Sequence, residues 1–443
     1  MKKYSICVFI SILLTVFYST SWAIESQWSG NFRTRWFSEK DWSGNSLRKY
    51  EKDRTQVDMR ANVAYTANIH DNLKFVSDFR MESAYGGAFA VGSKPKDVKM
   101  RQLYMDFSLN NANFIIGQQD FYEARGLLIY DAAPAFNFKY DLNDKIGVNF
   151  IWMKTAEGSD KFDNGVYEGR TDDIRDLDFY IVSSTVKLNP NITFKPYLAY
   201  GTSDELWQNP GTWGEYGWLP NAEFFDNIDL VYLGFDADAS FGPASVWFTA
   251  IYQTGTADVD ENAAIYNQIK DYSISGFTAA GGGSLNLGKI TLSGQLFFAT
   301  GDDDLNDDDI SCFVPGEGGY YYWSEIMGLG SNDDDILDNM EWALSNIIGG
   351  GAGVSVSPID KLTMDFSLWY AAALEDFIGK KTRQLVEAST YGTEVNAVIG
   401  YELMDNLKFT FIGAYVFAGD AITEKLPDDA NPYSVLGQLK LTF

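Results

Sequence analysis

Hydrophobic and polar residues alternate with a period of two along many segments of the chain. In the C-terminal segment 433–443, alternate positions are apolar or Gly and the intervening ones are polar, with Leu436 as the exception. The same alternation recurs in four other segments: 28–36, 57–65, 103–109 and 407–417. A period of two is that of a β-strand with one apolar face and one polar face. The pattern predicts amphipathic strands throughout the chain.

The predicted strands are joined by two kinds of connection. Tight-turn signals occur at 70–72, 110–111, 143–144, 189–191, 242–243, 288, 358–360 and 405–406. Polar segments rich in Gly and Asp follow the other ends of the strands, for example after Gly201, Gly255, Gly301 and Gly419. Alternation of short turns with long loops is typical of outer-membrane barrels, whose turns are periplasmic and whose loops are extracellular. Counting the strands predicts an all-β, transmembrane, antiparallel β-barrel of about eighteen strands, an even number.

Closure of this sheet follows from the lack of water in the membrane. A sheet edge exposed to lipid would leave backbone donors and acceptors unpaired, so a sheet that spans a membrane must close. The terminal Phe443, preceded by alternating apolar residues, resembles the C-terminal signal that the outer-membrane barrel-assembly machinery reads. A secreted β-sandwich or β-helix could also alternate, but neither explains the two kinds of connection together with the terminal Phe.

The N-terminus has the pattern of a secretory signal peptide. Lys2 and Lys3 precede an apolar run, 6–17, and small residues flank position 22. The run is shorter than the roughly 20 residues with which a helix crosses a membrane. The rest of the sequence contains no apolar run long enough for such a helix. We therefore expect a signal peptide at 1–23 and a barrel at 24–443.

If the aromatic faces of the strands contact lipid, the other faces line the lumen. The inward residues of the first strands are then mostly charged, and nine of them are our predicted pore-lining residues: Arg33, Arg35, Asp58, Arg60, Lys74, Asp78, Arg80, Glu82 and Asp106. Charges of both signs can orient dipolar solutes and select ions. They can equally pair with one another and only stabilise a wetted wall, and the sequence leaves both roles open.

Net charge restricts the partners. The formal charge of −27 repels nucleic acid, so none is expected as a partner. Much of the acidic excess lies in one long predicted loop, about 301–345, which could fold inward as a constriction. An EF-hand starting at Asp302 would need Gly where Asp307 stands, so we predict no dedicated metal site. A solvated acidic loop near membrane lipids and lipopolysaccharide is the simpler interpretation.

Catalytic motifs are weak. The single histidine, His70, falls in a predicted periplasmic turn, and Cys312 has no histidine to activate it. The glycine triplets 281–283 and 349–351 lack the lysine of a phosphate-binding loop. Residue types alone leave carboxylate chemistry on glycosides open. The prediction is a protein that is not an enzyme and carries no cofactor.

Residues 99–140 resemble the early strands of the alginate-export porin family. The resemblance rests on 103–107, on 115–121 and on Gly126-Leu127-Leu128. It implies a monomeric barrel of eighteen strands, in a family with a member that passes an anionic polysaccharide through an arginine-rich pore. Gln118 stands where that family commonly has Arg.

Three functions fit these observations. The first is a porin through which small hydrophilic solutes diffuse passively. A dedicated carbohydrate or organic-acid channel, such as a polysaccharide exporter, would need aromatic rings along the lumen, for which the candidates are Tyr104, Tyr180 and Trp247. A plugged barrel acting as a surface receptor is the third. The sequence does not choose between a monomer and a trimer.

Overall fold

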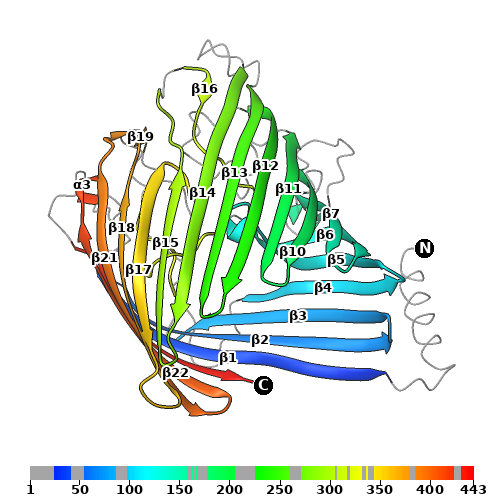
Figure 1. The fold of residues 1–443 in the computed structure, drawn as a ribbon, viewed down its shortest axis with the longest axis horizontal. Coiled ribbons are helices and arrows are strands. Elements are labelled where there is room, and N and C mark those ends of the chain that lie inside the picture. The colour runs from blue at the N-terminus through cyan, green and yellow to red at the C-terminus, as the bar shows by residue number, and fades with distance from the viewer. Residues whose placement is uncertain are drawn as a thin grey trace.

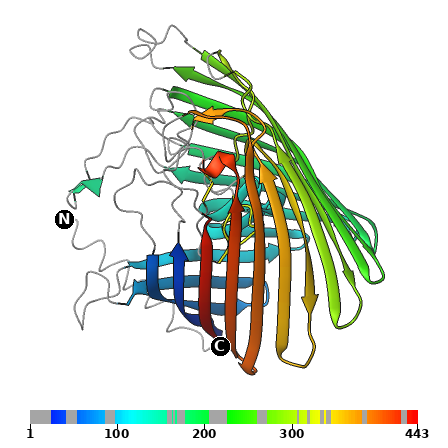
Figure 2. The same ribbon diagram turned by 90° about the vertical axis from the view of Figure 1, so that its left-hand side faces the viewer.

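The computed structural model describes fourteen ranges of the chain: 24–40, 54–85, 97–156, 162–163, 166–167, 177–204, 225–259, 271–304, 307–316, 320–331, 336–337, 344–378, 385–423 and 431–443. The predicted signal peptide, 1–23, and the acidic run 333–335 lie outside the described residues. Figure 1 and Figure 2 show two views of the ribbon at right angles.

Within these ranges the chain forms a closed antiparallel β-barrel of eighteen strands. The strands are β1 (Glu25–Lys40), β2 (Arg54–His70), β3 (Leu73–Ala84), β4 (Asp97–Leu109), β5 (Ala112–Glu123), β6 (Ile129–Asn143), β7 (Ile146–Ala156), β10 (Leu177–Asn189), β11 (Ile192–Asp204), β12 (Phe225–Phe241), β13 (Ala244–Val259), β14 (Asp271–Asn286), β15 (Ile290–Ala299), β17 (Ile347–Val356), β18 (Leu362–Ala372), β21 (Thr390–Met404), β22 (Leu407–Ala418) and β23 (Tyr433–Thr442). The prediction of an all-β barrel with about eighteen strands is confirmed.

The two ends of the chain close the barrel. β1 pairs along its length with β2 and also, antiparallel, with β23, from Asn31 opposite Thr442 to Lys40 opposite Tyr433. Phe443 continues this seam, because its backbone exchanges hydrogen bonds with that of Gly30. The seam leaves no free sheet edge between the first and last strands, as hydrocarbon requires.

Each tight-turn signal of the sequence lies between two neighbouring strands of the barrel. Two of these turns show the cause directly. The Asn143 side chain accepts hydrogen bonds from the backbone of Lys145 and Ile146, and the Asn189 side chain accepts one from Asn191. These local bonds satisfy backbone donors at the turn and favour chain reversal there.

Other elements are short. They are the hairpins of β8 (Phe162–Asp163) with β9 (Val166–Tyr167) and of β19 (Phe377–Ile378) with β20 (Leu385–Val386), the strand β16 (Asp309–Ile310), the 3-10 turn η1 (Ala124–Gly126) and the helix α3 (Asp420–Thr423). β16 runs parallel to β14 and pairs with it. In the described part of the chain, no helix has the length and apolar character needed to cross a membrane.

The outer face of the barrel is apolar. Large exposed side chains occupy alternate positions of the strands, such as Trp28, Phe32 and Trp36 on β1. Some of these rings pack across strands, as Trp28 does on Tyr65. Leu296, at 73% exposure, is typical of a side chain that projects from the barrel toward lipid.

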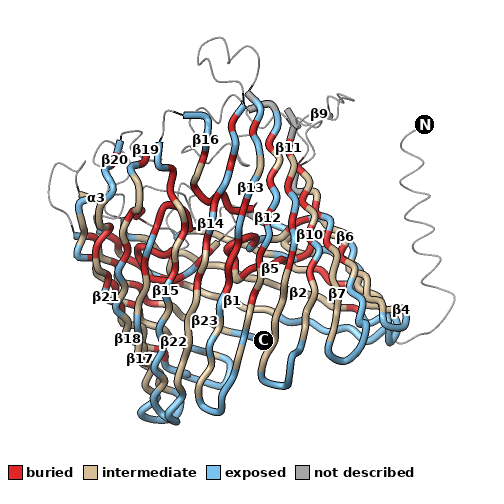
Figure 3. Tube along the Cα trace, turned by 45° about the horizontal axis from the view of Figure 1, so that its top comes forward, coloured by how far each residue is buried: buried red, intermediate tan, exposed pale blue. Residues whose placement is uncertain are grey.

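The hydrophobic core lies inside the barrel. On β10 the inward side chains Leu177, Phe179 and Ile181 are almost fully buried, whereas Val182 on the other face is exposed. Figure 3 shows the same alternation of buried and exposed positions along β11–β14, and exposed tight turns at one end of the barrel. The inward faces are buried because two segments of the chain pack against them from within.

Candidate channel constriction

Residues 300–346 connect β15 to β17, and we call this connection the inner loop; its described parts, 300–304, 307–316, 320–331, 336–337 and 344–346, pack inside the barrel. Its Phe313 meets Tyr232 of β12, with ring centroids 6.4 Å apart, and its Trp323 meets Phe297 of β15 at 4.8 Å. Phe313, Tyr232 and Phe297 are buried, whereas Val231, Leu233 and Leu296 on the other face of β12 and β15 are exposed. The inner loop therefore covers the inward faces of these strands.

Glu394 of β21 is the most highly bonded anchor of the inner loop. Its carboxylate accepts hydrogen bonds from the Ser324 hydroxyl and from the backbone N–H groups of Glu325, Ile326 and Met327, at 2.8 to 3.0 Å. The side chain is fully buried. A carboxylate that accepts four bonds in a dry site fixes the loop backbone strongly, because each donor would otherwise be unsatisfied.

Three further contacts tie the inner loop to the wall. The Gln253 amide oxygen accepts a hydrogen bond from the Val314 backbone at 2.6 Å. On β1, which is far from β13 in the ring of strands, the Arg35 guanidinium donates a hydrogen bond to the Ser331 carbonyl of the inner loop. At Gly276 a Cβ would come within 2.6 Å of the backbone at 312–313. The glycine is needed at that position because the loop backbone lies directly against β14.

A second segment enters the barrel between β5 and β6, and we call residues 122–130 the β5–β6 tip. Its η1 turn contacts β12 and β13, which lie several strands away in the order of the sheet. Arg125 donates to Thr249 at 3.0 Å, pairs with Asp238 at 2.6 Å and lies over the Trp247 ring. Ala124 and Arg125 both have positive φ, a strained conformation that these contacts hold in place.

The two inward segments meet in the middle of the barrel. The Tyr320 carbonyl of the inner loop lies against Gly126 of the β5–β6 tip, with no room for a side chain there. Tyr321 and Trp323 next to it pack on Phe297 of β15. Because the tip also contacts β12 and β13, which are close to β15 in the ring of strands, it is the β5–β6 tip that reaches across the interior to meet the inner loop.

The nine charged residues that the sequence suggested as pore-lining lie on β1–β4, which we call the charged wall. Asp58 pairs with Arg35 at 2.5 Å, Asp106 with Lys74 at 3.0 Å, and Arg60 with Glu82, which also lies 3.9 Å from Arg80. Arg33 is in register with Arg60, and Asp78 with Gln102. Register partners face the same side of a sheet, so the structure brings all nine together on the side where Arg35 meets the inner loop.

The sequence analysis missed part of this charged wall. Asp120 of β5 pairs with Arg101 at 3.0 Å and accepts a hydrogen bond from Gln102 at 2.5 Å. A register shift opposite Asp78 and Phe79 leaves Arg101 without a partner in β3. Such a bulge breaks the strict alternation of faces, so the period of two could not place Arg101.

Below the β5–β6 tip is a polar cavity of about 860 Å³. Inward side chains of β6, β7, β10 and β11 line it, among them Asn137, Asn149, Ser183 and the lysines 139, 187 and 195. Lys195 pairs with Glu123 of the tip at 2.5 Å. This part of the interior is therefore open and polar, unlike the core beside it.

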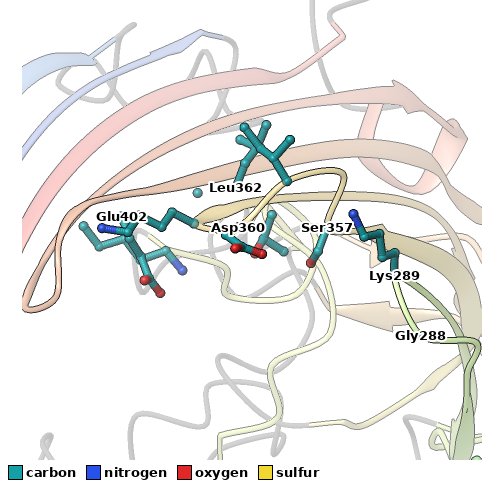
Figure 4. Close-up of a pocket in the computed structure, with 11 residues that line it drawn as sticks. Gly288, Lys289, Ser357, Asp360, Leu362 and Glu402 are labelled. Atoms are coloured by element: carbon teal, nitrogen blue, oxygen red, sulfur yellow. The ribbon is translucent and has the colours of Figure 1, made fainter.

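A smaller cavity of about 220 Å³ lies among the tight turns (Figure 4). Lys289 and Ser357 come from the turns on either side, and Asp360 and Glu402 add acidic groups. The Lys289 ammonium donates to the Pro358 carbonyl at 3.0 Å. Charges of both signs lie at this end of the barrel, and they connect neighbouring turns.

The residues considered for catalysis lie far apart. His70 ends β2 at a tight turn, where its Nδ1 accepts a hydrogen bond from the Asn72 backbone. Cys312 is buried in the inner loop, and burial raises the pKa of its thiol well above the ordinary value. Among the described residues, no group of three or more His, Cys, Asp or Glu side chains could hold a metal ion.

Of the three candidate aromatic residues for a solute path, two face inward. Trp247 lies under Arg125, and Tyr104 is on the same face of β4 as Asp106. Tyr180 faces outward, on the side of β10 opposite the buried Phe179, and stacks on Tyr200, which is also on the outer face. The expectation for Tyr180 was wrong because a one-residue difference in the assumed strand phase reverses the face.

No protein-family model matches the sequence, and no curated protein is similar to it in sequence. The fold is nevertheless similar to those of solved bacterial proteins. For OccAB4 of Acinetobacter baumannii the TM-score is 0.56 at 11% identity, over 95% of this chain and 98% of the other. A BenF-like porin of Pseudomonas fluorescens gives 0.56 at 9% identity, over 95% and 98%.

OpdK of Pseudomonas aeruginosa, solved with vanillate, gives a TM-score of 0.55 at 9% identity, again over 95% and 98%. Such similarity extends over almost the whole barrel, but identities this low indicate a shared fold alone. The chain therefore has the eighteen-stranded barrel fold of outer-membrane porins. The resemblance of residues 99–140 to alginate-export porins stays a prediction.

Proposed function

We propose that this protein is an outer-membrane porin through which small hydrophilic solutes diffuse passively. The observation that carries the proposal is the charged wall, which lies on the inner side of a barrel with an apolar outer face. Side chains such as Arg60, Glu82 and Lys74 are only partly buried, with 21%, 27% and 43% exposure. Charged groups that keep this much exposure inside a membrane barrel need water around them.

The two inward segments set the width of this path. The inner loop fills one side of the lumen with apolar residues and leaves the charged wall beside it. The nine residues of the charged wall are our proposed pore lining, five basic and four acidic. A passage with both signs of charge favours small polar or dipolar solutes, and it would pass salt ions with a modest preference.

The remaining parts of the proposal rest on the sequence. Residues 1–23 would direct export and be removed, and the strand that ends in Phe443 would engage the barrel-assembly machinery. Membrane lipids and lipopolysaccharide would surround residues 24–443, as either a monomer or a trimer. The resemblance of residues 103–121 makes an alginate-export relative the finer family proposal. No catalytic role, cofactor or metal is proposed.

Planar bilayers test the porin proposal directly. Residues 24–443 would be refolded, checked for a heat-modifiable barrel on gels, and inserted under a KCl gradient. We expect stable ohmic steps with a cation preference, which the net charge of −27 favours, and a weaker preference after Asp78→Asn or Asp106→Asn. Asp405→Asn is the matched control, because Asp405 is a fully exposed carboxylate in a tight turn. A folded barrel that conducts no ions would overturn the proposal.

A further inference from the structure

Four tyrosine rings gather where the two inward segments meet. Tyr122 and Tyr130 belong to the β5–β6 tip, and Tyr320 and Tyr322 belong to the inner loop. The Tyr130 ring lies at the centre, 5.3 Å from that of Tyr122, 5.9 Å from that of Tyr320 and 5.8 Å from that of Tyr322. Tyr320 and Tyr322 are stacked at 15°. We call these four residues the tyrosine cluster.

The tyrosine cluster is exposed although it lies within the barrel. Tyr122, Tyr130 and Tyr322 keep 59%, 40% and 42% exposure, whereas Tyr321, between two members of the cluster, keeps 6% and packs on Phe297. The inner loop thus buries the ring of Tyr321 and leaves that of Tyr322 exposed, with Tyr320 intermediate. The exposed parts of Tyr122, Tyr130 and Tyr322 can contact a solute.

The β5–β6 tip also has one buried face and one exposed face. Phe121 and Ile129, the sequence neighbours of Tyr122 and Tyr130, are buried. The tip therefore has one face in the core and one exposed tyrosine face, and Tyr122 on that face lines the polar cavity. Exposed aromatic rings from two separate segments are thus held at packing distance, with the Tyr130 ring edge-on to the other three and Tyr320 parallel to Tyr322, and together they form a preformed aromatic surface.

The charges beside the tyrosine cluster are compensated. Arg125, on the same tip, is paired with Asp238 at 2.6 Å. Asp236 accepts a hydrogen bond from Thr249 at 2.7 Å, and Lys195 is paired with Glu123. Arg125 and Lys195 therefore already have acidic partners, and the net charge of −27 further disfavours an anionic solute, although Lys139 and Lys187 line the polar cavity below.

We propose that the tyrosine cluster is a binding site for the ring face of a neutral sugar on its way through the barrel. A pyranose presents C–H groups on its faces, which are attracted to the negative face of an aromatic ring, and hydroxyls at its edge, which bond to tyrosine hydroxyls. This second proposal rests on the proposed porin function and adds a solute class to it.

Interruption of the ion current by sugar tests this site. Maltotriose would be added to single channels of the refolded chain, with sorbitol as a linear polyol and benzoate as an anionic ring. We expect maltotriose alone to interrupt the current. The double variant Tyr130→Leu, Tyr322→Leu keeps apolar bulk but loses two flat faces, and should weaken the effect of maltotriose about tenfold.

The matched control is Tyr180→Leu with Tyr200→Leu, since these two rings are also neighbours, with centroids 6.2 Å apart, but lie on the outer face of the barrel. This control should leave maltotriose binding unchanged. A channel that conducts but ignores maltotriose, or that responds to benzoate instead, overturns the sugar site and leaves the porin proposal intact. Calorimetry with the same sugar and refolded protein separates the two proposals, because sugar binding to a barrel that does not conduct supports the site and contradicts the porin.

Discussion

The inner surface of this barrel is divided into two regions of opposite character. On β1–β4 the inward side chains are charged, partly exposed and joined in ion pairs. On β7 and β10–β15 the inward side chains are mostly apolar and belong to one core with the inner loop and the β5–β6 tip. Both regions are built from antiparallel strands of one sheet, and they differ in whether other parts of the chain cover their inward side chains.

This difference shows that the rule of polar residues inside a large barrel applies only where the inside is wet. Ile151, Phe179 and Tyr232 face the lumen side yet are excluded from water. Burying such side chains stabilises each by about 1.5 to 3 kcal/mol relative to exposure, which favours folding the inner loop against them. On the charged wall, Arg35 donates a hydrogen bond to Ser331 of the inner loop, while Arg60, Glu82 and Lys74 remain partly exposed.

The largest effect is expected from releasing the inner loop from its anchor. Glu394→Ala removes the acceptor of three backbone N–H groups and one hydroxyl in a dry site, at about 1 to 3 kcal/mol for each donor left unpaired. We expect the loop to leave the apolar side and the single-channel conductance to rise. Glu402→Ala, an exposed carboxylate near the end of the same strand, should change neither conductance nor protease resistance. Unchanged conductance in Glu394→Ala would contradict the role of this anchor.

A smaller effect should follow from a cavity in the apolar side. Phe179→Ala leaves a hole between β10 and the inner loop and should lower the free energy of unfolding by about 3 to 5 kcal/mol. Urea unfolding in lipid vesicles, followed by tryptophan fluorescence, measures it. Val182→Ala on the outer face of β10 is the control, because its side chain is exposed to the surroundings of the barrel. Equal losses for the two variants would show that the inside of β10 is not a core.

The smallest effect on stability is expected on the charged wall. Lys74→Gln breaks a partly exposed pair with Asp106 and should cost less than about 1 kcal/mol. It should nevertheless shift the reversal potential toward cations, because a positive charge is removed beside the path. Lys361→Gln makes the same charge change at a tight turn and should shift the reversal potential less. A larger shift from Lys361 would place the selective region at the turns.

Much of the fold could be predicted from the sequence, and particular residues show why. The turn residues around Asn143 and Asn189 act through bonds to their own backbone, so their effect is visible locally. The charged residues of β1–β4 were assigned to one face because strands with a wet side keep a clean period of two. That regularity fails at Arg101, where a bulge changes the phase.

The candidate site was harder to predict. The four tyrosines come from two segments almost two hundred residues apart. Residues 320–322 are three consecutive tyrosines, of which only Tyr321 is buried, and the sequence does not show which one it is. Glu394 looks like any inward carboxylate of a barrel strand. Its role depends on loop donors that arrive from about seventy residues away.

By itself, the sequence determined that the chain closes into a barrel with an apolar outer face, because alternation, turn chemistry and the need to pair every backbone group act over a few residues at a time. Only the tertiary structure decided which part of the interior is dry, where the inner loop is fixed and which rings stay exposed. Those features arise from contacts of the inner loop and the β5–β6 tip with strands far from them in the sequence, and no local pattern encodes such contacts.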